Sequence, residues 1–369
     1  MQLTSQKLKK AAHAIHSGAL VGVANIERFA NAPRGMHPLN IFPDCKSVVS
    51  VICPIPRGSY RGINEGTHWP NYTFYSYNRL NTLFRPAVTY SVSCLLEDYG
   101  WEAVPVYPGV PERPGLRTPV APGRPAPEIN LNVRIAAVAC GLGEIGWSKV
   151  FLTRKYGPRV RIGTILTDAE LEPDPLVEPG TLCNRCMACA RDCPGGAIPH
   201  PKEGDPISIA IEDKAYEWGN VHMGRCTLTH HGLNWEASPF LKKDFPGLDL
   251  RVRTSDMSEE AAYKLTYPMA SARWPASPEF PSNSCIEFYD QIKSHTDYFA
   301  VCGARGCIVA CSETLEKRGC IEQCNFKTAM RPRPHWQMPP PEKDRTGGIA
   351  EGRFPKLYNQ PDNAPGKWD

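Results

Sequence analysis

Four cysteines follow one another at a spacing that few folds can accommodate. They form the run Cys183-x2-Cys186-x2-Cys189-x3-Cys193, and Pro194 comes directly after the last of them. Three thiolates at this spacing wrap one corner of an iron–sulfur cubane, and the fourth, followed by proline, turns away to serve a second cubane, as in two-cluster ferredoxins. A structural zinc knuckle or disulfides would account for CxxC pairs but not for the full run. The spacing therefore predicts a chain that moves single electrons.

A second cluster needs three further cysteines, and the chain has 15 in all. We favour Cys302, Cys307 and Cys311, because the last two repeat the x3 gap of the first run. By the crossover of two-cluster ferredoxins, Cys311 completes the first cluster and Cys193 joins the second. The predicted ligands of the first cluster are therefore Cys183, Cys186, Cys189 and Cys311.

The fourth ligand of the second cluster is left open by the spacing alone. Cys226 and Cys285 are the two candidates, and Cys320 and Cys324 form a further Cys-x3-Cys pair that could compete. Buried free thiols are common in protein cores. Packing therefore suffices to explain the remaining cysteines, which are Cys45, Cys53, Cys94 and Cys140.

Composition favours a reducing compartment. The sequence shows no signal peptide, no twin-arginine signal and no apolar run of about 18 residues. We therefore expect a cytoplasmic protein that is not bound to a membrane, and the cluster spacing suggests an anaerobic cytoplasm. A net charge of +4 over 369 residues favours neither nucleic acid nor an anionic membrane as a partner. The oligomeric state cannot be read from the sequence.

Hydrophobic periodicity predicts alternating helices and strands up to about residue 175. The expected helices cover residues 5–17, 85–99 and 133–140, and the expected strands cover residues 20–24, 46–53 and 160–167. A cysteine-dense, loop-rich part follows. We predict an α/β cofactor domain at 1–175, a ferredoxin-like iron–sulfur domain at 176–330 and a proline-containing tail at 331–369.

Proline is concentrated in the segment 105–127, which holds eight of the 37 prolines. Proline removes main-chain donors and fixes φ, so this segment is predicted to be an extended loop. It is either a lid over a cofactor or a surface excursion.

The segment Gly141-x-Gly143-x-x-Gly146 has the letters of a dinucleotide fingerprint. It follows a predicted helix rather than a strand, which disfavours a dinucleotide site. The glycines either let the main chain approach a planar ligand or make a tight turn between helices.

From Gly141 to Pro194 the chain resembles epoxyqueuosine reductases and, more distantly, reductive dehalogenases. The resemblance rests on GLGEIGW, LTRKYGPRVRIGTILTDAELEPD and CNRCMACARDCPGGAI. It implies cobalamin (a cobamide) and two [4Fe-4S] clusters, with a nitroreductase-like α/β (α+β) domain holding the corrinoid base-off ahead of a ferredoxin-like module. The implied corrinoid contacts are Gly141, Leu142, Gly143, Glu144, Ile145, Gly146 and Asp168.

The same resemblance bears on the second cluster, because Arg225-Cys226 is similar to the isolated lysine-cysteine of dehalogenases. It implies Cys226, rather than Cys285, as the fourth ligand. The second cluster then has the ligands Cys193, Cys226, Cys302 and Cys307.

The chain also departs from these families. It lacks Asp-x-His-x-x-Gly, so no histidine is expected on cobalt, and Pro127 stands nearest to the position of the acidic proton donor of epoxyqueuosine reductases. Glu128 could replace that donor. Dehalogenases use a tyrosine beside a basic residue, which points to Tyr72, Tyr75 and Tyr77, with Arg79 adjacent.

We therefore expect a corrinoid-dependent iron–sulfur oxidoreductase that reduces an unidentified small molecule. Its electrons would come from a low-potential donor such as ferredoxin or flavodoxin. The alternatives are a non-catalytic electron carrier or corrinoid-reducing protein, and a two-cluster ferredoxin fused to an inert α/β domain.

Overall fold

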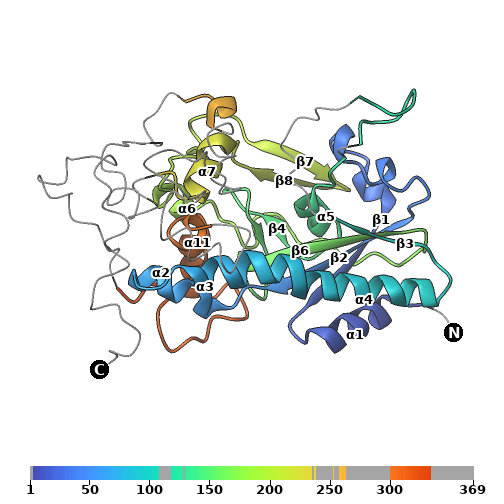
Figure 1. Cartoon of the computed structure of the whole chain (residues 1–369), viewed down its shortest axis with the longest axis horizontal. Coiled ribbons are helices and arrows are strands. Elements are labelled where there is room, and N and C mark those ends of the chain that lie inside the picture. The colour runs from blue at the N-terminus through green and yellow to red at the C-terminus, as the bar shows by residue number, and fades with distance from the viewer. Residues whose placement is uncertain are drawn as a thin grey trace, which may run out of the picture.

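The computed structural model describes residues 3–107, 118–127, 129–234, 237, 252, 257–262 and 300–333 (Figure 1). Its largest sheet has four strands, and all neighbouring strands are antiparallel. Their order is β1 (Leu20–Asn25), β2 (Ser47–Pro54), β6 (Val160–Thr167) and β3 (Ala103–Val106). A dinucleotide-binding fold needs a parallel sheet. The described part of the chain is therefore of the α+β kind, and its antiparallel sheet, like the sequence, disfavours a dinucleotide site at the glycine segment.

Both faces of this sheet are buried. Successive side chains of a strand point to opposite faces, so Val49 and Val51 of β2 join one hydrophobic core while Val48 and Ile52 join another. The central strands are rich in β-branched residues, as expected for buried strands. Each face must consequently be covered by other elements.

Helices α1 (Ser5–Ile15) and α4 (Arg85–Asp98) lie side by side on the first face (Figure 1). Helix α4 approaches β6 closely at Gly163, where a Cβ atom would come within 2.4 Å of the Thr89 methyl group. The glycine thus lets the helix pack directly against the centre of the sheet.

A long helical segment precedes α4. It begins with α3 (Pro70–Thr73) and continues through two π-helical stretches, η5 (Phe74–Asn78) and η6 (Leu80–Phe84). A π turn joins residues five apart, so Tyr72 and Tyr77 share a face and their ring centroids lie 5.7 Å apart. An α-helical period of 3.6 residues would separate them.

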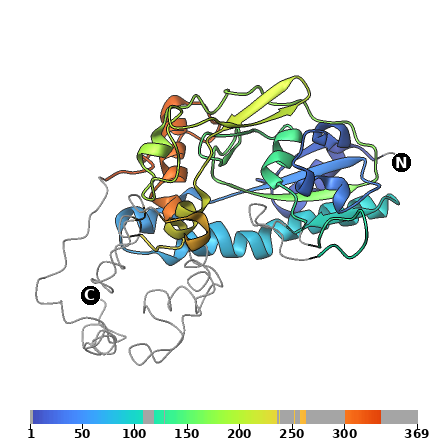
Figure 2. The same cartoon turned by 90° about the horizontal axis from the view of Figure 1, so that it is seen from above.

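The second face is covered by α5 (Val133–Ala139) and by a hairpin of β7 (Ile207–Ile211) and β8 (Lys214–Trp218). Asn132 caps α5, because its side-chain oxygen accepts the main-chain N–H of Ile135 at 3.3 Å. Figure 2 shows the hairpin and α5 on the side of the sheet opposite α4.

The elements that carry the cysteines gather at one end of the sheet, on the left in Figure 1. They are α6 (Ala188–Arg191), α7 (Met223–His230), η8 (Cys302–Ala304) and α11 (Cys307–Arg318). Helix α11 ends at Gly319, whose φ of 62° is the left-handed conformation that favours glycine.

Residues on both sides of position 175 share the two larger cores. Val309 of α11 is buried with Val49 of β2 in the first core, and Trp218 of β8 is buried with Ile135 of α5 in the second. The cysteine-rich part of the chain therefore packs on the sheet through continuous apolar contacts.

Short elements connect the larger ones. They are η1 (Ile26–Phe29), η2 (Arg34–Met36), η3 (Pro38–Asn40), η4 (Arg57–Tyr60), α2 (Arg61–Glu65), β4 (Glu144–Ile145) and β5 (Phe151–Leu152).

All six predicted helices and strands are present, and their ends differ from the prediction by at most two residues. Strand β3 and the β7–β8 hairpin were not predicted. Of the proline-rich segment predicted as a possible lid, residues 108–117 lie outside the described residues. Within the described ranges, none of the helices combines the length and the apolar character needed to cross a membrane.

Candidate iron–sulfur and reduction site

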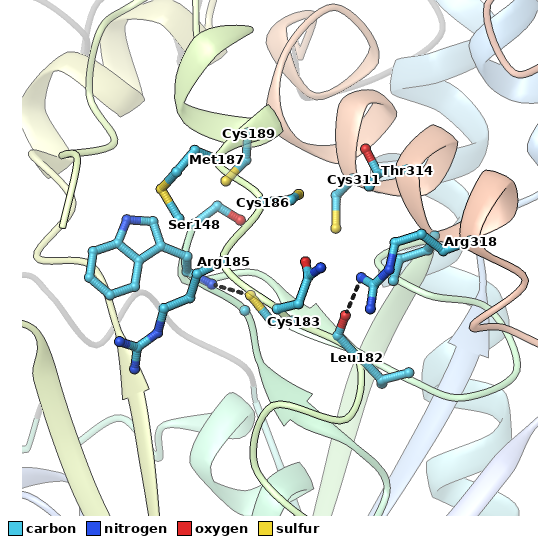
Figure 3. A pocket seen from close by; sticks show the side chains of 14 residues that line it. Ser148, Leu182, Cys183, Arg185, Cys186, Met187, Cys189, Cys311, Thr314 and Arg318 are labelled. Carbon is cyan, nitrogen blue, oxygen red and sulfur yellow. Dashed lines mark hydrogen bonds between the residues drawn. The ribbon is translucent and has the colours of Figure 1, made fainter.

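Four predicted ligands line one pocket where α6 meets α11. Cys183 and Cys186 come from the loop before α6, Cys189 from α6 and Cys311 from α11. Figure 3 shows their thiols facing a common space. Burial raises the pKa of Cys311 well above its usual value, and the neighbouring thiols of Cys189, Cys183 and Cys186 raise it further. The pocket thus brings together the four residues assigned to the first cluster.

The loop that carries Cys183 is held by Glu144 of β4. The Glu144 carboxylate is only 3% exposed and accepts the main-chain N–H groups of Gly180 at 2.7 Å and Cys183 at 2.9 Å. It also accepts the N–H of Leu182. Three hydrogen bonds to one charged acceptor fix the loop strongly.

Main-chain N–H groups also point at two of the sulfur atoms. The N–H of Trp147 donates to Cys183 Sγ at 3.2 Å, and the N–H of Ala197 donates to Cys193 Sγ at 3.3 Å. Hydrogen bonds to sulfur are a principal means by which proteins tune iron–sulfur clusters. The donor set and its surroundings therefore fit thiolate ligands of a cluster.

The other four predicted ligands form a second group. Burial raises the pKa of Cys302 well above its usual value, and Cys307, Cys226 and Cys193 raise it further. Cys226 therefore lies beside Cys193, Cys302 and Cys307, the three ligands that the crossover spacing assigned to the second cluster. Cys285, its competitor in the sequence, lies outside the described residues.

The remaining thiols point elsewhere. Cys320 donates to the carbonyl of Arg318 at 3.7 Å, and Cys324 donates to the side chain of Asn325 at 3.8 Å. Burial raises the pKa of both Cys53 and Cys140 to about 12, as expected for packing thiols. The 14 cysteines that the structure describes form no disulfide, and no three His, Cys, Asp or Glu side chains in the described part are grouped as ligands of a single metal ion.

The three predicted catalytic tyrosines lie in different surroundings. Tyr75 is 43% exposed and packs edge-on against Phe74, away from the others. Tyr72 is fully buried, and its hydroxyl lies so close to Gly303 that a Cβ atom there would be 1.9 Å away. Because Gly303 follows Cys302, Tyr72 adjoins the second cysteine group.

Tyr77 lies between a cation and a histidine. The Arg161 guanidinium is 4.0 Å from the centre of the Tyr77 ring, and the His230 ring centroid is 5.0 Å away. Burial raises the pKa of Tyr77, while Arg161 opposes this shift. The phenol therefore keeps its proton at neutral pH. Arg79, the cation suggested by the sequence, lies over the Phe74 ring at 5.0 Å instead.

The Cβ sides of Gly141, Gly143 and Gly146 in the glycine segment face other protein atoms. A Cβ atom at Gly143 would lie 1.8 Å from the Leu152 carbonyl, and one at Gly141 would lie 2.3 Å from the Pro175 carbonyl. Gly146 faces the side chain of Leu152 at 3.0 Å. These glycines therefore permit close main-chain packing. The Leu152 carbonyl fills the space on the Cβ side of Gly143, and the contact of this segment with a planar ring stays a prediction.

Other predicted corrinoid contacts also have partners in the fold. Glu144 holds the cysteine loop, and Ile145 is buried in the second core. Asp168 accepts the main-chain N–H of Glu102 at 2.8 Å, beside the start of β3. Leu142 lines a separate groove together with Gly141. The predicted proton donor Glu128 lies outside the described residues.

Sequence reasoning missed Arg161, His230 and the structural role of Glu144. Arg161 is the one charged residue in the predicted strand VRIGTILT. A lone charge in a buried strand indicates that this side chain interacts with a polar or aromatic group. His230 follows Cys226 by four residues, so both lie on one side of α7. No sequence pattern links Glu144 to Cys183.

Comparison with known proteins identifies relatives of part of the chain. No protein-family model matches it. Tetrachloroethene reductive dehalogenase of Desulfitobacterium hafniense is 44% identical over 79 residues, which are 21% of this chain and 14% of the dehalogenase. Epoxyqueuosine reductase of Escherichia coli strain K12 is 40% identical over 68 residues, which are 18% of this chain and 17% of the reductase. Over part of its length the chain is homologous to both kinds of reductase.

The homology to reductive dehalogenases and epoxyqueuosine reductases confirms the resemblance predicted from the sequence. The matched segment spans less than a fifth of the length of these curated relatives. A solved structure of a catabolic reductive dehalogenase aligns with 60% of this chain and 28% of its own, at 18% identity and a TM-score of 0.42.

Proposed function

We propose that the chain is an iron–sulfur reductase that delivers single electrons, through a base-off cobamide, to a small-molecule substrate. The observation that carries the proposal is the grouping of eight cysteines into two sets of four, the second of which adjoins Tyr72 and Tyr77. When bound, two [4Fe-4S] clusters supply electrons one at a time. Partial homology to two kinds of reductase supports the same reaction class.

Tyr77 is the residue that we propose as the proton donor. Reduction of an organic substrate consumes protons as well as electrons, and a positioned acid accelerates the transfer. The raised pKa of Tyr77 keeps a proton on its hydroxyl, and Arg161 stabilises the phenolate that is left after the proton is given up. Burial holds the pKa of His230 well below its usual value, so this neighbour is neutral and does not compete as a cation.

The cobamide rests on homology rather than on a site in the described residues. One solved reductive dehalogenase is described as B12-dependent. The segment that the resemblance assigned to the ring is packed against Leu152 and Pro175 on its Cβ side, and the corrinoid contacts that the resemblance implies stay predictions. The substrate, the cytoplasmic location and the electron donor likewise belong to the proposal.

Iron content tests the central part of the proposal. Anaerobic reconstitution should give about eight irons per chain, as two cubanes require. Cys226→Ala should lower the value towards about four irons, whereas Cys320→Ala, a matched change of a thiol with another partner, should leave it unchanged. A wild-type plateau near four irons, or equal losses in both variants, would contradict the assignment of the second group.

Cobalt content and turnover test the rest. After incubation with hydroxocobalamin, about one cobalt per chain should remain bound, and the Co(II) spectrum should lack histidine nitrogen splitting. Epoxides, organohalides and activated alkenes form the substrate panel. If cobalt is retained and reduced but none of the panel is consumed, the corrinoid-reducing carrier replaces the enzyme.

A further inference from the structure

One ligand of the first cysteine group lies at the surface. Cys186 is the only exposed cysteine among those that the structure describes, whereas Cys302 of the second group is buried. The first group therefore reaches the surface at Cys186, whereas none of the four cysteines of the second group is exposed.

Three arginines lie beside the first cysteine group. Arg185 is the neighbour of Cys186 in the chain and lies over the Trp147 ring at 5.2 Å. Arg191 donates to the carbonyl of Cys186 at 3.2 Å, and Arg318 donates to the carbonyl of Leu182 at 3.0 Å. All three arginines are exposed. Figure 3 shows Arg185 and Arg318 on opposite sides of Cys183 at the pocket.

The nearby carboxylates cancel only part of this positive charge. Glu217 pairs with Arg185. Asp192 beside α6 and Glu313 on α11 both pair with Arg331 instead. Glu316, the other acidic residue of α11, pairs with Arg57. Arg191 and Arg318 have main-chain acceptors and no carboxylate partner within the described ranges. The surface around Cys186 thus carries a net positive charge.

We propose that an acidic ferredoxin docks on this surface, an inference that rests on the proposed function. A positive patch steers and orients a negatively charged partner. One electron would pass from the reduced ferredoxin to a cluster held by the Cys183, Cys186, Cys189 and Cys311 thiolates, with no bond formed or broken.

Binding of an oxidised acidic two-cluster ferredoxin, measured by calorimetry at low and high salt, tests the inference. The double variant Arg191→Gln/Arg318→Gln should weaken binding about tenfold at low salt and reduce its salt dependence. The matched control Lys10→Gln/Arg124→Gln removes the same charge from exposed residues of α1 and of the loop before α5, and it should bind like the wild type. The rate of one-electron reduction by the reduced ferredoxin should follow the same order.

A charge-preserving variant separates docking from support of the loops. Arg191→Lys/Arg318→Lys keeps both charges but loses the planar fork that reaches the two carbonyls, and it should retain most of the binding. Iron content is measured for every protein. A wild type without iron refutes the proposed function itself. With iron present, unchanged binding in the glutamine variant, equal weakening in the control, or binding of flavodoxin in place of ferredoxin would refute the docking inference.

Discussion

The carboxylate of Glu144 accepts the main-chain N–H of Cys183 at 2.9 Å, which joins the glycine segment to the first cysteine group. A buried negative charge beside a cluster ligand disfavours the reduced, more negative cluster. This single contact links β4 with the loop of the predicted ligands, two features that the sequence shows as separate motifs.

Replacing Glu144 by glutamine should therefore raise the midpoint potential of the first cluster. Loss of an interaction of about 1.4 kcal/mol corresponds to about 60 mV for one electron, and we expect a shift of that order. The lost hydrogen bonds to a charged acceptor should also cost about 2 kcal/mol of unfolding free energy. A redox titration followed by electron paramagnetic resonance measures the potential.

Glu217→Gln is the control for this prediction. The Glu217 carboxylate is 36% exposed and pairs with Arg185 near the same pocket, so solvent screens its charge. Its removal should shift the potential much less. Equal shifts of the midpoint potential in the two variants would show that the burial of Glu144 and its hydrogen bond to Cys183 have no specific effect on the cluster.

The glycine segment should prove to be structural. In Gly143→Ala the new Cβ atom would lie 1.8 Å from the Leu152 carbonyl, so β4 and β5 would have to separate. We expect a loss of about 3 kcal/mol, or a melting temperature lower by about 10 °C, together with reduced iron in the first cluster. Gly58→Ala, at a position with no neighbour within 4 Å, should change neither quantity. If Gly143→Ala instead lost cobalt while its stability and iron content stayed normal, the result would support a corrinoid ring lying against this segment.

Tyr77→Phe should separate proton donation from packing. The substitution keeps the ring between Arg161 and His230 and removes only the hydroxyl. Turnover should fall by about 100-fold or more, the usual contribution of a general acid, with iron content unchanged. Tyr75→Phe, at an exposed tyrosine on the same helical segment, should retain full turnover. Equal turnover in the two variants would remove Tyr77 from the reaction.

Much of the fold follows from local sequence patterns. The strand over residues 160–167 is specified by its β-branched run. Ferredoxin crossover spacing predicts the first cysteine group and three members of the second, whereas Cys226 is implied only by the family resemblance. The β7–β8 hairpin has a period-2 pattern in ISIAI, with Glu212 at a φ of 53° in the turn, so its signal was present.

Other features have no local signal. The pairing of Tyr72 with Tyr77 depends on π turns, which a 3.6-residue period does not predict. The contact of Glu144 with residues near 180 depends on how the elements pack in three dimensions. The cation beside Tyr77 comes from β6, far along the chain, because the strand places Arg161 on the face that the helix covers.

His230 should make the folded protein sensitive to mild acid. Burial, followed by His231 and Arg161, holds the pKa of His230 well below its usual value of 6.5. As the pH falls below about 6.5, His230 therefore takes up a proton in the unfolded chain but stays neutral in the folded chain. The contribution of His230 to the free energy of unfolding is present above that pH and decreases below it. The slope approaches about 1.4 kcal/mol per pH unit for one proton. His230→Phe keeps a ring against Tyr77 without the titration, so melting temperatures of the reconstituted proteins between pH 7.5 and 5 should fall more steeply for the wild type than for the variant. Parallel curves would show that His230 takes up its proton equally in both states.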